Sequence, residues 1–162
     1  MVNLFIYRGY PGSGKSTEAR ANADLTGGVL IERDAIRHML FGKYWGLKRR
    51  QEETVTLAQY ELIKAAIGHG SNVHIADTNL RLETATGLVE LGQSLGAHVI
   101  IMDIKTSANE CISRDMKRKR EGGRYVGSKV ILDFARKYPM PWPAIVSMNY
   151  NEETAKVELV KH

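Results

Sequence analysis

A glycine-rich segment with the chemistry of a phosphate-binding loop spans residues 9–17, GYPGSGKST. It follows an apolar run at residues 2–7 and precedes a stretch typical of a helix, which is the context that such a loop needs. Glycines let backbone N–H groups turn inward around an anion, and the helix N-terminus adds partial positive charge. Lys15 would reach the terminal phosphates of a nucleotide, and the Ser16 hydroxyl would ligate Mg²⁺. We expect ATP and Mg²⁺ as cofactors, with the nucleotide held by Gly9, Pro11, Gly12, Ser13, Gly14, Lys15, Ser16 and Thr17.

A carboxylate follows the next apolar segment, in the sequence Glu32-Arg33-Asp34-Ala35-Ile36-Arg37. At the end of a strand, Asp34 would face a crevice in which it could take a proton from an acceptor hydroxyl. Arg37 lies three residues on, about one helical turn away on the same face. An Asp that opens a helix is also an ordinary N-cap, so a structural role for Asp34 stays open.

A second carboxylate ends the apolar run at residues 73–76, where Asp77 is followed by Thr78 and Asn79. An acidic residue at this place can hold the metal ion or its water shell. It can equally cap the turn that follows, and both interpretations remain open.

Positive charge is concentrated between Arg114 and Arg124, where six basic and two acidic residues give a net charge of +4. Arg114 and Arg118 are four residues apart, so they project from one side of a helix. The glycine pair at 122–123 gives the chain a flexible exit. Such an arm could fold over bound nucleotide, exclude water and place a guanidinium on the transferred phosphoryl group. The alternative is a solvated helix face.

Segments typical of strands alternate with segments typical of helices along the chain. This order, with strongly apolar strands, predicts an α/β fold with a mainly parallel sheet flanked by helices on both faces. The three polar sequences above all follow strands, and such sheets bind ligands at the carboxyl ends of their strands. We expect strands at 2–8, 28–32, 73–76, 97–103, 144–150 and 155–160, and helices at 15–24, 34–41, 50–68, 83–95, 107–119 and 128–138.

Length and composition are those of one globular domain. The chain has 162 residues, 43% of them hydrophobic, and a formal net charge of +5, which suggests a polyanionic partner. No apolar run approaches the roughly 20 residues that span a bilayer, and we expect neither a signal peptide nor a membrane partner. The single cysteine, Cys111, fits a reducing compartment. The five histidines show no ligand spacing, and the base-reading Asn-Lys-x-Asp motif of switch GTPases is absent from the sequence.

Taken in order, the motifs resemble the kinase domain of 5′-hydroxyl polynucleotide kinases, a family that includes bacteriophage end-healing enzymes. The resemblance rests on the phosphate loop, Arg33-Asp34-x-x-Arg37, Asp77-Thr78-Asn79 and Arg114-x-x-x-Arg118, and it runs through roughly residues 1–138. It implies a P-loop phosphotransferase that moves the γ-phosphate of ATP to the 5′-OH end of DNA or RNA. We expect the enzyme in the cytoplasm, which for a phage-encoded enzyme is the cytoplasm of the host.

The resemblance also implies roles for single residues. Asp34 would be the general base, Arg37 would grip the 3′-phosphate of the acceptor, and Arg118 would stabilise the transition state beside Lys15. Arg114 would pack on the adenine. Asp77, with Thr78 and Asn79 on the acceptor side, would order the site through hydrogen bonds or join Ser16 at the metal.

Departures from the family pattern leave several points open. Arg120 could compete with Arg118 for the catalytic role. The sequence contains no Asp-x-Asp phosphatase motif, so we expect residues 1–162 to form a single kinase domain with an Arg-rich lid at about 112–126 and an unassigned tail at 139–162. The insert at 43–50 mixes Tyr44 and Trp45 with basic residues; these rings could stack on bases of a single strand or pack in the core. A kinase of a small acceptor, such as a nucleoside, sugar or antibiotic, and a regulatory or toxin-like nucleotide-binding module are the alternatives.

Overall fold

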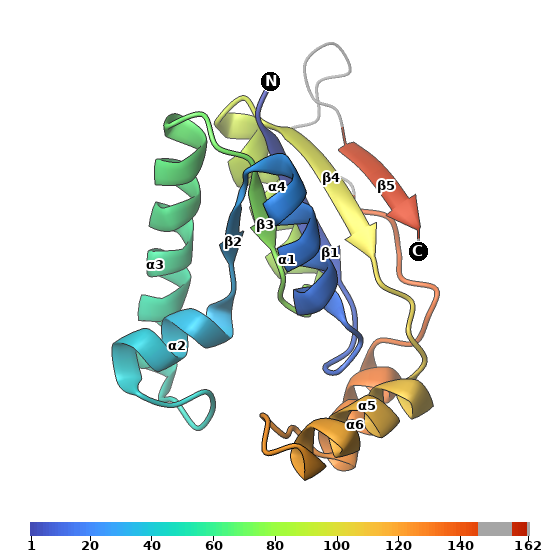
Figure 1. Cartoon of the computed structure of the whole chain (residues 1–162). Helices are drawn as coiled ribbons and strands as arrows, with labels where there is room; N and C mark the ends of the chain where they lie inside the picture. Colours follow the sequence, from blue (N-terminus) through green and yellow to red (C-terminus); the bar gives the residue numbers. More distant parts are fainter. Residues whose placement is uncertain (146–156, 162) are drawn as a thin grey trace.

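The computed structural model describes residues 1–145 and 157–161 of the chain. Within them, five parallel strands form one sheet in the order β2-β3-β1-β4-β5 (Figure 1). The strands are β1 (Asn3–Arg8), β2 (Val29–Ile31), β3 (Val73–Ile75), β4 (His98–Asp103) and β5 (Val157–Lys161). The helices are α1 (Lys15–Thr26), α2 (Arg33–Phe41), α3 (Arg49–Gly68), α4 (Leu82–Ser94), α5 (Ala108–Arg120) and α6 (Ser128–Lys137).

Helices cover both faces of the sheet because both faces of its central strand are apolar. Successive side chains of a strand point to opposite faces. Leu4 and Ile6 of β1 join the large core cluster that contains side chains of α3 and α4, such as Ile63 and Leu88. Tyr7, on the other face, packs with Ala19 of α1 and belongs to a second cluster. The two clusters account for the layered α/β architecture that the alternating sequence predicted, and the predicted fold class is confirmed.

The predicted element boundaries agree with the structure to within two residues for every helix and for the strands up to Asp103. The strand expected at 155–160 is present as β5 and pairs with β4. The strand expected at 144–150 is not seen at Ala144 and Ile145, and the rest of that range lies outside the described residues. None of the helices in the described part of the chain is long and apolar enough to cross a bilayer.

The elements that carry the basic and acidic motifs meet beyond the carboxyl ends of the strands. The loop after β1, helix α2 and the α5–α6 pair all lie at this edge of the sheet (Figure 1). Helices α5 and α6 pack on each other around a third, smaller cluster that includes Cys111 and Ile131. The fold therefore brings the predicted loop, the predicted base and the basic segment to one side of the molecule.

A buried ion pair joins the ends of the two longest strands. Arg8 ends β1 and Asp103 ends β4; the two residues are partners in the parallel register. The Arg8 Nε–Asp103 Oδ1 distance is 2.7 Å, and both side chains are almost fully buried. Arg8 also donates to the Pro143 carbonyl at 2.9 Å, and its guanidinium lies 5.8 Å from the Trp142 ring centroid. This pair fixes the segment after α6 against the sheet edge on which the site is built.

Removing one partner of this pair should destabilise the protein strongly, because the remaining charge would be buried without compensation. We expect Asp103→Leu to lower the free energy of unfolding by about 3–5 kcal/mol. The double variant Arg8→Met/Asp103→Leu should recover most of that loss, since it leaves no unpaired charge. Urea denaturation of both variants measures the difference; a double variant as unstable as the single one would contradict the assignment.

Candidate active site

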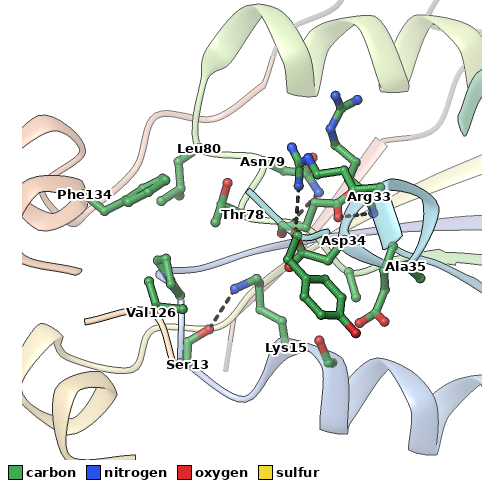
Figure 2. A pocket seen from close by; sticks show the side chains of 18 of the residues that line it. Ser13, Lys15, Arg33, Asp34, Ala35, Thr78, Asn79, Leu80, Val126 and Phe134 are labelled. Atoms are coloured by element: carbon green, nitrogen blue, oxygen red, sulfur yellow. Dashed lines mark hydrogen bonds and ion pairs between the residues drawn. The ribbon is translucent and has the colours of Figure 1, made fainter. Parts of the chain in front are cut away.

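One large cleft, with a volume of ≈ 2130 Å³, lies at the carboxyl edge of the sheet. It is lined by the loop after β1, the first turns of α2 and α3, the loop after β3, helix α5 and the 121–127 segment between α5 and α6 (Figure 2). The structure brings most of the sequence-predicted site residues into this lining. They are Pro11, Gly12, Ser13, Gly14, Lys15, Ser16, Thr17, Asp34, Arg37, Asp77, Thr78, Asn79, Arg114 and Arg118.

The phosphate loop depends on glycine at two positions. Gly12 and Gly14 have φ values of 82° and 96°, in the left-handed region that side chains disfavour. A Cβ on Gly12 would also lie 2.8 Å from the Cys111 carbonyl oxygen. These two glycines therefore let the loop turn tightly over α5 before α1 begins at Lys15.

Lys15 is buried at the base of the loop. Its Nζ donates to the Tyr10 carbonyl oxygen at 2.8 Å. It also lies 3.4 Å from Ser13 Oγ, the contact that Figure 2 marks with a dashed line. Burial lowers the pKa of this ammonium to about 8, opposed by the negative charges of Asp77 and Asp34. Since both hydrogen-bond acceptors are neutral oxygens, the charge of Lys15 is weakly compensated and suits an incoming phosphate.

Asp77 links β3 to two helices. Its Oδ1 accepts the backbone N–H of Arg33 at 2.8 Å, and its Oδ2 accepts Gln59 Nε2 at 2.7 Å. Burial raises the pKa of this carboxyl despite those two bonds. Asp77 thus satisfies a free N–H in the first turn of α2 from a different strand, instead of capping the turn that follows it.

Ser16 fits a magnesium site better than Asp77 does. Its hydroxyl lies in the exposed first turn of α1 and lines the cleft, whereas both Asp77 oxygens are engaged. The described part of the chain contains no group of three or more Asp, Glu, His or Cys residues that could hold a metal ion. Mg²⁺ in nucleotide sites keeps several waters and binds phosphate oxygens together with few protein ligands, so the role of Ser16 as one of them stays a prediction. Direct coordination by Asp77 stays a prediction.

Asp34 does not cap α2, so the capping interpretation is wrong. Glu32 is the N-cap residue, and Asp34 lies in the first turn with about a third of its side chain exposed. One oxygen pairs with Arg37 Nη1 at 2.8 Å, and the other pairs with Arg124 Nη1. The carboxylate is held between two guanidinium groups at the wall of the cleft.

Arg37 is itself engaged by a residue that the sequence analysis did not assign. Its Nε lies 3.0 Å from Glu52 Oε1, and Arg33 Nη2 lies 3.1 Å from Glu52 Oε2. Burial alone would raise the pKa of Glu52, but the bonds and charges of Arg37 and Arg33 lower it. The only sequence signal for Glu52 was an acidic pair directly after the basic insert.

The arginines of α5 differ in what they touch. Arg114 donates to the Ser13 carbonyl at 2.9 Å and to Glu110 at 2.8 Å, so it braces the phosphate loop. Arg118 pairs with the buried Asp115 at 3.0 Å, and its Nε is buried with no hydrogen-bond partner among the described residues. Arg118 lines the cleft and Arg120 does not, which favours Arg118 for the predicted catalytic role. Closure of residues 112–126 over a nucleotide stays a prediction.

A family model described as an AAA domain matches residues 4–141. The chain belongs to this AAA domain family. A search of curated proteins found no match.

Several solved structures are similar to this AAA domain. A chain of the Pnkp1/Rnl/Hen1 RNA repair complex is 24% identical, with a TM-score of 0.73 over 93% of this chain and 50% of that one. A gluconokinase from Sinorhizobium meliloti is 19% identical, with a TM-score of 0.58 over 98% and 82% of the two chains. Kti12 of Chaetomium thermophilum in complex with ADP-AlF₃ is 14% identical, with a TM-score of 0.69 over 98% and 88%.

This AAA domain therefore has the P-loop kinase fold, which implies nucleotide binding at the loop. It spans half the length of the first of these relatives. A chain from a second structure of the Pnkp1/Rnl/Hen1 complex is 29% identical; the match covers 70% of this chain and 38% of that one.

Replacing Lys15 should have opposite effects on thermal stability and on ATP binding. Lys15→Met removes a buried cation, so we expect the melting temperature of the nucleotide-free AAA domain to rise near pH 7, and stabilisation by added ATP to be lost. The advantage of the variant over the parent should shrink as the pH rises from 8 to about 10. In this range the unfolded parent binds more protons than the folded parent, so the stability of the parent increases with pH. Thermal unfolding with and without ATP across this pH range measures both effects. A variant that melts lower than the parent and is still stabilised by ATP would refute the assignment.

Proposed function

We propose that this chain transfers the γ-phosphate of ATP to the 5′-hydroxyl end of a DNA or RNA strand. The observation that carries the proposal is the placement of Asp34 and Arg37 in the wall of the cleft that holds Lys15 and the phosphate loop. A kinase needs a phosphate cradle and a base for the acceptor hydroxyl within one enclosed space. The likeness to a chain of an RNA repair complex, at 24% identity, supports this choice of acceptor.

The donor half of the reaction would be served by the loop and its two polar side chains. The backbone N–H groups and Lys15 would hold the β- and γ-phosphates, and Ser16 would hold Mg²⁺, which neutralises charge on the transferred group. Arg118, whose buried Nε has no partner among the described residues, would add a guanidinium to the transition state. Arg114 would keep the loop in shape through its bond to the Ser13 carbonyl.

The acceptor half would be served by Asp34 and the arginines around it. Asp34 would accept the proton of the 5′-hydroxyl as the hydroxyl oxygen bonds to the γ-phosphorus and the bond from that phosphorus to the β,γ-bridging oxygen breaks, which releases ADP. Arg33, Arg37 and Arg124 face Asp34 and Glu52 in this group, so three positive charges meet two negative ones. The surplus charge suits a phosphate on the acceptor, which would bind where Arg37 now pairs with Glu52.

A small-acceptor kinase is the second candidate. The likeness to a gluconokinase covers most of both chains and supports it. Incubation with radiolabelled ATP and, in parallel, a 5′-OH oligonucleotide, a nucleoside 3′-phosphate, a nucleoside and gluconate decides between the two. Label on gluconate or nucleoside alone would overturn the polynucleotide assignment.

Asp34→Asn tests the base directly. Asparagine keeps one acceptor oxygen for Arg37 or Arg124, loses the second acceptor on this partly exposed side chain, and cannot take a proton. We expect transfer to fall by roughly 10²–10⁴-fold with near-parental melting temperature and ATP binding. Asp133→Asn is the matched control, because Asp133 forms an i,i+3 pair with Arg136 on the exposed face of α6. Parental turnover by a well-folded Asp34→Asn variant would show that another group takes the proton.

Arg37→Ala tests which acceptor group the arginine meets. If Arg37 holds an acceptor phosphate, kcat/KM for nucleoside 3′-phosphates should fall further than kcat/KM for plain nucleosides. The extra loss should correspond to about 1.5–3 kcal/mol, the usual contribution of a charge-assisted bond. Steady-state kinetics on both acceptors give the ratio. Equal losses would mean that Arg37 acts only by holding Asp34 and Glu52.

A further inference from the structure

The segment between α2 and α3 presents two aromatic rings at the mouth of the cleft. Tyr44 is 37% exposed and Trp45 is 67% exposed, yet both line the cleft. The core-packing interpretation of Trp45 is therefore wrong. Leu47 packs against the main core cluster, and the Lys48 N–H donates to the Gln51 side chain at 2.8 Å. The segment is anchored at one end while its rings stay at the surface.

Contacts between side chains connect these rings to Asp34. The Arg124 guanidinium pairs with Asp34 and also lies 5.6 Å from the centroid of the Tyr44 ring. Tyr44 is held in turn by stacking on His38, with centroids 4.8 Å apart and planes 15° from parallel. The Trp45 centroid lies 6.5 Å from that of Tyr44. Consecutive side-chain contacts thus link the proposed base Asp34 to the exposed indole of Trp45 through Arg124 and Tyr44.

Basic residues flank this path on both sides. Lys43, Lys48, Arg49 and Arg50 are exposed around the rings, and Lys119 and Arg120 are exposed at the end of α5 across the cleft. Exposed aromatics between positive charges suit a single strand, in which bases stack on rings and phosphates follow the cations. A second copy of this chain would bring the same positive charge to the surface and fits poorly. A lipid bilayer would meet the indole but could not reach Arg124 beside Asp34.

We propose that Tyr44, Trp45 and Arg124 form a subsite for the single-stranded nucleotides that follow the 5′-terminal nucleotide of the acceptor. This inference rests on the proposed function and deepens it. The phosphate between the second and third nucleotides, one beyond the phosphate assigned to Arg37, meets Arg124 and draws it from Asp34, and the base that follows this phosphate stacks on Trp45. The acceptor strand itself then frees the base for proton removal. Single-stranded acceptors of several nucleotides are accordingly preferred over nucleoside 3′-phosphates.

Tryptophan fluorescence tests the stacking without any turnover. The chain has two tryptophans, and Trp142 is only 8% exposed. Titration with 5′-OH oligothymidylate at low salt, without ATP, should quench the emission of the parent. Trp45→Phe should still bind labelled oligothymidylate, measured by anisotropy, but lose the quench. Binding without a quench in the parent, or an equal quench in Trp45→Phe, would overturn the proposal, as would a response to anionic phospholipid vesicles in place of oligothymidylate.

Kinetics then distinguish failure of the subsite from failure of the proposed function. Trp45→Ala should raise KM for a 5′-OH hexanucleotide by about 5–150-fold, the affinity equivalent of one stacked base, with kcat and the KM for a nucleoside 3′-phosphate unchanged. Leu57→Ala, an exposed apolar residue of α3 outside the cleft lining, is the control. Equal KM changes for both acceptors, or none, would overturn the subsite while leaving the kinase intact. A parent that phosphorylates neither acceptor would overturn the proposed function, whereas the fluorescence result would still decide whether the surface binds nucleic acid.

Discussion

The position of the acceptor side of this cleft depends on one half-buried carboxylate. Asp77 follows the end of β3, and its carboxylate accepts hydrogen bonds from a backbone N–H of α2 and from the Gln59 amide of α3. Those two bonds offset part of the desolvation that raises its pKa. Because α2 starts at the residue that Asp77 holds, the carboxylate sets where Asp34 and Arg37 stand relative to the sheet and to the phosphate loop.

Charge compensation in the cleft is distributed unevenly, and the unevenness matches the proposed chemistry. Arg33, Arg37 and Arg124 are paired with Asp34 and Glu52 at the acceptor wall, so this wall is ordered without a ligand. Lys15 and Arg118 are less satisfied: one has only neutral acceptors, and the other has a buried Nε without a partner in the described residues. Both undersatisfied cations belong to the side that would receive the polyphosphate. Preorganised donors of this kind favour an incoming negative charge without reorganisation.

The sequence predicted what depends on local pattern. Apolar runs predicted every helix, and the strands up to Asp103, to within two residues. The glycine loop with its lysine predicted the nucleotide side of the cleft, because this motif too is encoded within a short window. It failed for residues whose role depends on distant partners. The capping role expected as an alternative for Asp34 was wrong because Asp77, more than 40 residues away, satisfies the start of α2. In the sequence, Glu52 and Arg124 could be recognised only as charged residues without an assigned role. No spacing rule places Arg124 beside Asp34, which lies 90 residues away.

The pairing of Asp34 with Arg124 gives a physical reason for a kinase to favour its acceptor over water. With Arg37 and Arg124 in place, each carboxylate oxygen already accepts from a guanidinium, so a water molecule in the cleft competes with two cations for this base. A nucleic-acid acceptor brings phosphates that compete for the same guanidiniums, whereas water and neutral solutes do not. The competing charge would release the carboxylate only when the hydroxyl to be deprotonated is bound beside it. Specificity of the proposed reaction would then arise from the charge of the acceptor before any base is read, and the rings at the mouth of the cleft would add affinity that is independent of sequence.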